Sequence, residues 1–254
     1  MMYNVIDLTG KQILITGASS GMGRETAILC SKLGAKVALV ARNEGKLKEV
    51  MTKIDGDGHA YYSFDLSRVD EIEGFIKAVI AERGAMDGFV HSAGVGSTRP
   101  LKLLKPAALR EVMEINYFSF VEIIRCLMKK NAYNEGMSIV GISSISSKQG
   151  NQTKTAYCAS KAAMDATVRC LAKELADKKV RVNAVNPALI RTEIYQQFLN
   201  NSGESEDAKT IMQRQYLGIG EPIDVANMIV YLLSSAAKFI TGSCVDIDGG
   251  RLSS

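Results

Sequence analysis

A serine, a tyrosine and a lysine near the middle of the chain have the types and spacing for acid–base chemistry. Ser144 ends an apolar stretch, MSIVGISS, and Tyr157 and Lys161 follow in the run YCASK. Positions i and i+4 share one face of a helix, so the phenol and the ammonium are expected to lie side by side. A surface contact within a helix is the alternative reading of this pair taken alone. After a strand that ends in serine, the pair predicts a tyrosine that acts as an acid or base on a bound substrate.

A positive charge is what such a tyrosine needs. Its hydroxyl ionises near pH 10, and lowering that pKa by about three units requires about 4 kcal/mol. One charge at about 4 Å supplies about that much at an effective dielectric constant of about 20. We therefore expect Lys161 to lower the pKa of Tyr157, and Ser144 to hydrogen-bond the substrate oxygen. Asn116, expected within a long helix, has an amide suited to hold a water that relays protons from Lys161 to solvent.

Three glycines early in the chain indicate a binding turn for a dinucleotide. The segment ILITGASSGMG places Gly17, Gly21 and Gly23 directly after an apolar strand. Gly17 permits a tight exit from the strand, Gly21 lets the backbone approach a pyrophosphate, and Gly23 lets the next helix sit close to the sheet. The pyrophosphate would then face the positive end of that helix.

The end of the second predicted strand, Val40-Ala41-Arg42-Asn43, indicates which nicotinamide cofactor binds. Binders of NAD place an acidic residue there to hold the adenine ribose, whereas binders of NADP need room and positive charge. Ala41 removes the carboxylate, and Arg42 can form a forked bond to a 2′-phosphate. NADP(H) is therefore expected in preference to NAD(H). The alternative is that Arg42 is a solvated surface charge.

Elements that could position these residues alternate along the chain. Seven candidate strands lie at about 13–15, 36–41, 59–66, 87–94, 137–144, 180–187 and 243–250, and the main helical patterns at about 106–130, 155–177 and 221–234. Strands that look buried on both faces and alternate with helices predict an α/β, Rossmann-like, doubly wound parallel sheet with helices on both faces. At 254 residues, we expect a single domain, 1–254.

Composition excludes several other classes. The net charge of +4 comes from scattered basic residues, which argues against nucleic-acid binding. Five separated cysteines without a C-x-x-C pair and only two histidines predict a reducing compartment and no metal site. No apolar run reaches the length of a membrane span, so a soluble cytoplasmic protein is expected.

Across essentially its whole length the sequence resembles the short-chain dehydrogenase/reductase family. The resemblance is carried by TGASSGMG, Asp65-Leu66, HSAG at 91–94, Asn116, Ser144, Tyr157, Lys161 and a terminal DGG. It implies a catalytic tetrad of Asn116, Ser144, Tyr157 and Lys161, in which the lysine also holds the nicotinamide ribose. The residues expected at the cofactor are Gly17, Ser19, Ser20, Gly21, Met22, Gly23, Arg42, Asn43, Asp65, Leu66, Ser92, Ala93, Gly94, Tyr157, Lys161, Pro187, Ile190 and Thr192.

The chain departs from the family pattern at two points. His91 and Ser92 stand where two asparagines are usual, so the hydrogen bonds at that strand end must be rebuilt. We expect His91 to be a structural replacement rather than a second base. Pro187-Ala188 replaces the usual Pro-Gly, which fits the fold if φ at that turn stays negative.

The resemblance implies an NADPH-dependent oxidoreductase that reduces a carbonyl to a secondary alcohol, or runs the reverse oxidation. Lys129, Lys130 and Lys173 resemble docking positions for an acyl carrier protein, which makes a 3-oxoacyl-carrier-protein reductase one alternative. A sugar, polyol or hydroxysteroid dehydrogenase is another. A non-catalytic NADP(H)-binding sensor or scaffold is the alternative of a different class, and it predicts erosion of the tetrad.

Two expectations concern larger parts of the molecule. Residues 193–220 form a long polar and acidic tract with apolar flanks, which predicts a substrate lid, with a helical surface excursion as the alternative. A homotetramer, or a dimer, is implied by the resemblance, with the helices near 106–130 and 155–177 packing against symmetry mates. The small side chains of Ala159, Ala162, Ala163 and Ala166 would permit close approach.

Overall fold

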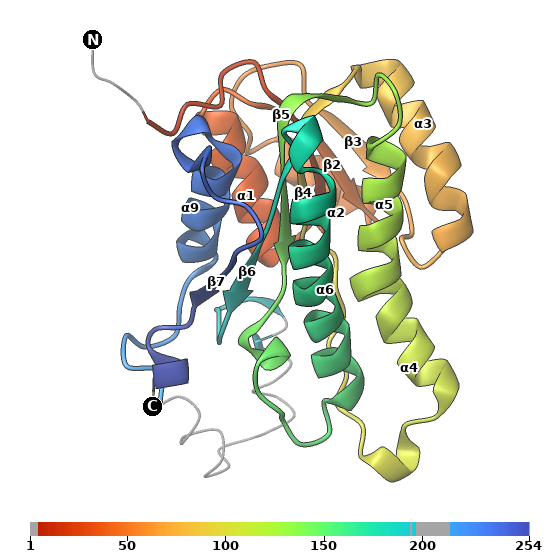
Figure 1. Ribbon diagram of the computed structural model, residues 1–254, viewed down its shortest axis with the longest axis vertical. Helices are drawn as coiled ribbons and strands as arrows, with labels where there is room; N and C mark the ends of the chain where they lie inside the picture. The colour runs from red at the N-terminus through yellow and green to blue at the C-terminus, as the bar shows by residue number, and fades with distance from the viewer. Residues whose placement is uncertain (1–4, 194, 197–213, 254) are drawn as a thin grey trace.

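The computed structural model describes residues 5–193, 195–196 and 214–253, and its centre is a seven-stranded parallel sheet (Figure 1). The strands are β1 (Gln12–Thr16), β2 (Lys36–Ala41), β3 (Ala60–Ser63), β4 (Met86–His91), β5 (Tyr133–Ile142), β6 (Arg181–Pro187) and β7 (Cys244–Ile247). Their spatial order is β3-β2-β1-β4-β5-β6-β7. The order reverses between β1 and β4, and ligands of such sheets collect beyond the strand ends at that point.

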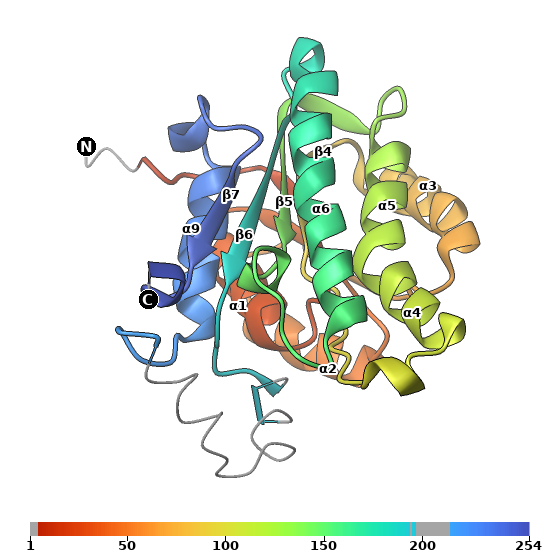
Figure 2. The same cartoon turned by 60° about the horizontal axis from the view of Figure 1, so that its bottom comes forward.

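Helices cover both faces of the sheet, as the sequence predicts. They are α1 (Gly21–Lys32), α2 (Glu44–Met51), α3 (Ile72–Arg83), α4 (Pro106–Met113), α5 (Ser119–Leu127), α6 (Thr155–Glu174) and α9 (Pro222–Leu233). Apolar side chains of α1, α2 and α9 build one core, and those of α3, α5 and α6 build the other. Figure 2 shows α5 and α6 side by side in front of the sheet, with α9 beyond β7.

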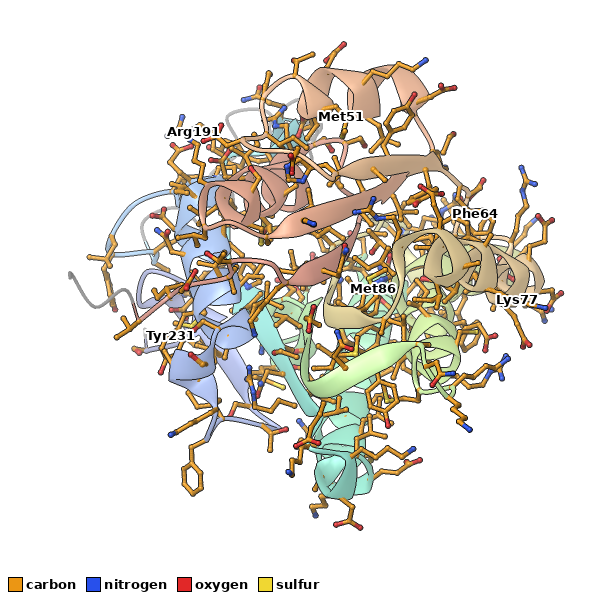
Figure 3. All side chains as sticks on the ribbon, turned by 90° about the horizontal axis from the view of Figure 1, so that it is seen from above. Met51, Phe64, Lys77, Met86, Arg191 and Tyr231 are labelled. Carbon is orange, nitrogen blue, oxygen red and sulfur yellow. The ribbon has the colours of Figure 1, made fainter. Side chains whose placement is uncertain are left out.

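The strands are short and apolar because both of their faces are buried. Ile13, Leu14 and Ile15 of β1 are at most 1% exposed and pair in register with β2 and β4. In Figure 3 the buried Met86 lies inside the molecule, whereas Lys77 extends from the outer face of α3. Burial on both faces explains the absence of polar alternation along these strands. Among the described residues, no helix combines the length and the apolar character that crossing a membrane requires.

Several predicted bounds are wrong by a few residues. The strand expected at 59–66 is only Ala60–Ser63, and the one expected at 137–144 is Tyr133–Ile142. The helix expected at 106–130 is interrupted by a π-helical turn, Glu114–Phe118, between α4 and α5. Periodicity does not reveal this turn, since one inserted residue alters the helical face only locally.

Candidate active site

The glycine turn joins β1 to α1 at the carboxyl edge of the sheet. Gly17 has φ +64° and Gly21 has φ +51°, values that side-chain-bearing residues rarely adopt. A Cβ on Gly17 would lie 2.6 Å from the Ala93 nitrogen, and one on Gly23 would overlap the Gly17 carbonyl oxygen. The absence of a side chain at Gly23 lets the first turn of α1 contact the backbone of Gly17. The absence of one at Gly17 lets the turn contact the backbone of Ser92 and Ala93 after β4.

The amino end of α1 has no side-chain cap, and the nearest carboxylate is that of Glu193, 3.6 Å from the position of a Cβ on Gly21 and 3.9 Å from Arg24. Ser20 occupies the N-cap position, but its side chain forms no capping hydrogen bond, and the first turn holds no acidic residue. The first N–H groups of a helix lack partners within the helix and carry its positive dipole end. These groups therefore suit the phosphates of a dinucleotide.

His91 ends β4 beneath this turn and is fully buried. Its Nδ1 lies 3.0 Å from the Thr16 hydroxyl, which also accepts a hydrogen bond from the Ala93 N–H at 3.4 Å. Burial and, to a smaller extent, the positive charge of Lys161 together lower the pKa of His91 to about 3, against the opposing effect of the Ile115 backbone. His91 is therefore neutral at pH 7 and rebuilds the strand end through Thr16, as expected of a structural replacement.

A groove runs across the carboxyl ends of β1, β2, β3 and β4. Of the residues expected at the cofactor it is lined by Gly17, Ser19, Ser20, Gly21, Met22, Arg42, Asn43, Asp65, Leu66, Ser92, Ala93, Gly94 and Thr192. Gly23, Tyr157, Lys161, Pro187 and Ile190 are not part of its lining. Lining residues that sequence reasoning missed are Lys46, Phe64, Val95, Ile115 and Glu193.

Arg42 and Lys46 place two exposed cations at the end of this groove beside β2. Asn43 is the N-cap of α2, and its Oδ1 accepts a hydrogen bond from the Lys46 N–H at 2.9 Å. The cap starts α2 directly after Arg42, and Lys46 in the first turn of that helix lines the groove together with Arg42. Asn43 is a preferred N-cap residue, and this is the signal in the sequence that places Lys46 in the first turn after the strand end.

Ser144 lies just beyond β5 and is 8% exposed. Its Oγ accepts a hydrogen bond from the Ser146 N–H at 3.1 Å and donates to the Pro187 carbonyl at 3.5 Å. The Ser144 side chain also acts on the Tyr157 hydroxyl and lowers the pKa of that phenol. The structure thus brings Ser144 and Tyr157 together, as predicted.

Tyr157 and Lys161 lie near the amino end of α6, and their spacing on one helical face is as predicted. The expected lowering of the Tyr157 pKa by Lys161 is wrong for this structure, because burial raises that pKa more than Ser144 lowers it. The Lys161 Nζ lies 5.8 Å from the centre of the tyrosine ring and donates a hydrogen bond to the Ile142 carbonyl at 2.7 Å. Lys161 is not among the groups that shift the pKa of the Tyr157 hydroxyl in this structure.

Asn116 lies in the π-helical turn rather than in a regular helix, and it is fully buried. Its Nδ2 donates to the Val95 carbonyl at 3.1 Å and to the Ser160 hydroxyl at 3.0 Å, while its Oδ1 accepts from the Val95 N–H at 2.8 Å. Both amide protons are therefore committed, which restricts the expected water contact to one lone pair of Oδ1. Asn116 braces the segment after β4 against α6.

Asn116 and Lys161 both lie close to Gly94. A Cβ at Gly94 would lie 3.4 Å from the Asn116 Oδ1 and 3.6 Å from the Lys161 Nζ. Both polar groups therefore border the same glycine at the end of the groove. All four members of the predicted tetrad meet beyond β4 and β5.

The segment after β6 returns to the glycine turn. Pro187 and Ile190 are buried, and Thr192 lies 3.2 Å from the position that a Cβ on Gly21 would take. Ala188 has no positive φ, so Pro187-Ala188 fits the turn as expected. Most of the lid predicted at 193–220 lies outside the described residues. The described part at its carboxyl end is anchored to the chain just after β6 by Gln215, whose side chain hydrogen-bonds the Leu189 N–H and carbonyl.

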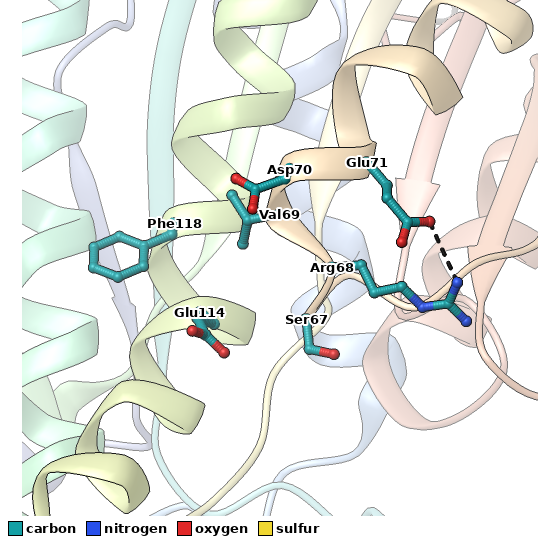
Figure 4. Close-up of a pocket in the computed structure, with 7 residues that line it drawn as sticks. All are labelled: Ser67, Arg68, Val69, Asp70, Glu71, Glu114 and Phe118. Atoms are coloured by element: carbon teal, nitrogen blue, oxygen red, sulfur yellow. Dashed lines mark hydrogen bonds and ion pairs between the residues drawn. The ribbon is translucent and has the colours of Figure 1, made fainter.

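Two other features carry no residue of this chemistry. A cleft between the start of α3 and the π-helical turn is lined by Ser67, Arg68, Val69, Asp70, Glu71, Glu114 and Phe118, and Figure 4 shows Arg68 paired with Glu71 there. Glu73, Glu122 and Cys126 lie close enough to hold a metal ion. Arg125 and Lys129 form ion pairs with Glu73, and Arg125 also pairs with Glu122, so we assign this cluster to an ion-pair network.

Comparison with known proteins finds relatives along nearly the whole chain. A family model described as enoyl-(acyl carrier protein) reductase matches residues 17–251. The chain is 34% identical over 249 residues to a 3-oxoacyl-[acyl-carrier-protein] reductase of Rickettsia felis, covering 98% of this chain and 99% of the relative. It is 31% identical to an L-xylulose reductase of Caenorhabditis elegans, covering 96% of each.

A solved structure shares the fold and the covered length. A 7α-hydroxysteroid dehydrogenase, solved in complex with NADH and 7-oxo glycochenodeoxycholic acid, superposes with a TM-score of 0.88 at 31% identity. The superposition covers 98% of each chain. The likeness therefore includes the elements that carry the groove and the tetrad.

Proposed function

The chain belongs to the short-chain dehydrogenase/reductase family, whose members act on CH–OH and C=O groups, and from that premise we propose that it is an NADPH-dependent carbonyl reductase. The observation that supports this most strongly is that Ser144, Tyr157, Lys161 and Asn116 lie near one another, with Asn116 and Lys161 beside Gly94, a lining residue of the groove of the glycine turn. Reduction of a ketone to a secondary alcohol, or the reverse oxidation, is the reaction that these groups suit.

The residues of this chain account for the proton side of the reaction. The Ser144 hydroxyl hydrogen-bonds the substrate carbonyl and polarises it, and the Tyr157 hydroxyl donates the proton that converts the developing alkoxide to an alcohol. Lys161 carries a positive charge beside the tyrosine ring, which favours the phenolate left after donation. Bound NADPH would supply the hydride.

The groove supports binding of a dinucleotide phosphate. The glycine turn and the uncapped start of α1 suit the pyrophosphate, and Asp65 and Leu66 line the wall expected to meet the adenine. Arg42 and Lys46 support NADP(H) over NAD(H), because two cations at the end of β2 favour a 2′-phosphate. The carboxylate that would hold an NAD ribose is replaced there by Ala41.

The substrate is proposed only as a carbonyl compound of one of two classes. A 3-oxoacyl thioester is favoured by likeness to the Rickettsia reductase, and a sugar, polyol or steroid by likeness to the other relatives. Lys173 lies about 24 Å along α6 from Tyr157, and Lys129 is paired with Glu73. Docking of a carrier protein at these lysines would therefore have to serve the site of a neighbouring subunit.

A panel assay tests the proposal. Loss of NADPH absorbance is followed with ketones, 3-oxoacyl thioesters, keto-sugars and 7-oxosteroids, with the Tyr157→Phe variant as the matched inactive control. Turnover of one class by the wild type and not by the variant is the expected result. Absence of turnover with every class, in a protein that binds NADPH, would favour the non-catalytic sensor.

A further inference from the structure

Asp165 is a buried carboxylate behind the tetrad. It lies on α6 four residues beyond Lys161, so the two side chains share one face of the helix. The residue is 5% exposed, and none of the ion pairs among the described residues includes it. Burying an ionised carboxylate is costly unless hydrogen bonds and an opposite charge compensate.

One oxygen of this carboxylate holds both segments that position Ser144. The Asp165 Oδ2 accepts hydrogen bonds from the Ser147 hydroxyl and from the Asn186 Nδ2, the latter at 3.3 Å. The Ser147 N–H is bonded to the Ser144 carbonyl, and Asn186 directly precedes Pro187, whose carbonyl accepts the Ser144 hydroxyl. A single carboxylate oxygen thus connects α6 to the loop after β5 and to the end of β6.

The other oxygen, Oδ1, has no hydrogen-bond partner among the described residues. The carboxylate affects the Lys161 ammonium by electrostatic attraction without a direct hydrogen bond, and this attraction raises the Lys161 pKa. The other ionisable groups around this pair are Tyr157 on α6, His91 from β4, Cys244 from β7, Arg169 one turn further along α6, and the ion pair of Lys148 with Asp246. His91 is neutral at pH 7 and does not replace the carboxylate.

We propose that Asp165 is a positioning residue of the active site, whose carboxylate holds the Ser144 loop against β6 and serves as the counter-charge of the Lys161 ammonium. Burial lowers the pKa of Lys161, and because the charge of Asp165 opposes this effect the pKa falls only to about 8. Removing the carboxylate charge should therefore let Lys161 lose its proton at lower pH. The importance for turnover rests on the proposed function, whereas the electrostatic pairing does not.

The test uses the protein without ligands and distinguishes the effect of the Asp165 charge from that of its hydrogen bond with Ser147. Lysine side chains labelled with ¹³C at Cε are titrated by NMR, and the Lys161 signal is assigned by its loss in Lys161→Arg. Asp165→Asn keeps an acceptor for Ser147 but removes the charge, and the Lys161 midpoint is expected to fall by roughly one pH unit. Ser147→Ala keeps the charge and should leave the midpoint unchanged while it lowers kcat. Asp165→Glu should restore the midpoint.

An unchanged Lys161 midpoint in a folded Asp165→Asn protein overturns the proposal, even if the melting temperature falls. Should the Asn variant not fold, Asp165→Ser is titrated instead with the same two outcomes. A shifted midpoint in a chain that reduces no carbonyl substrate would leave the pairing intact and overturn only the proposed function.

Discussion

Tyr157 is the residue at which the proposed chemistry is most directly tested. Tyr157→Phe removes the proton donor and keeps the ring, so turnover should fall to a small fraction of the wild-type rate while NADPH affinity changes little. Lys161→Ala should reduce both, because the ammonium lies beside Gly94 of the groove as well as beside the tyrosine ring. Steady-state kinetics and calorimetric titration with NADPH measure the two effects. A Tyr157→Phe enzyme that retains most of its activity would contradict the mechanism.

Arg42 is the residue expected to determine cofactor choice. Arg42→Ala should weaken NADPH binding by about 1.5 to 3 kcal/mol, the range for a hydrogen bond to a charged group, and leave NADH binding nearly unchanged. Lys48→Ala is a matched control, since Lys48 is an exposed cation of α2, the helix that follows Arg42, and is paired with Glu44 outside the groove. Equal losses for both cofactors, or a wild-type preference for NADH, would show that the assignment is wrong.

The close contact of α1 with the glycine turn can be tested at the scale of the element. Gly23→Ala places a Cβ against the Gly17 carbonyl oxygen and 2.8 Å from the Ser92 hydroxyl, so it should destabilise the fold and weaken NADPH binding. Gly74→Ala on α3 is the control, because nothing lies within 4 Å of its Cβ. That change should raise the free energy of unfolding by about 0.5 to 1 kcal/mol. Denaturant titration distinguishes the two.

The stability of the whole molecule should depend on pH through His91. Its pKa of about 3 lies below the ordinary 6.5, so the unfolded chain binds a proton that the folded chain excludes. This contribution is complete above about pH 6.5 and is lost as the pH falls toward 3, a change on the order of a few kcal/mol. His91→Asn should flatten the pH dependence of the melting temperature, whereas His59→Asn should keep it. Equal profiles for the wild type and His91→Asn would contradict this account.

Assembly is the remaining expectation at this scale. Ala159, Ala162 and Ala166 form an exposed strip of small side chains on α6, and Phe118 beside α5 is 42% exposed. We expect light scattering at micromolar concentration to give four times the 27.5 kDa chain mass. Ala162→Arg should lower that mass because a large charged side chain prevents close helix packing. A monomeric mass for the wild type would refute the expectation.

Local patterns in the sequence determined the elements and most of the groove. Seven apolar runs became seven strands because burial on both faces of a parallel sheet requires such runs. The glycines at 17 and 21 were recognisable because only glycine tolerates their backbone angles readily. The spacing of Tyr157 and Lys161 put them on one face because an α-helix has a fixed period.

Tertiary structure alone decided the electrostatics. The pKa of His91, the ammonium of Lys161 turned toward the Ile142 carbonyl, and the raised pKa of Tyr157 all follow from burial by strands and helices distant in sequence. Asp165 reads in the sequence as one more polar residue of a helix, and it becomes a counter-charge only where β6 and the loop after β5 enclose it. Desolvation and charge pairing depend on what surrounds a group in space, which the spacing of residues along the chain does not specify.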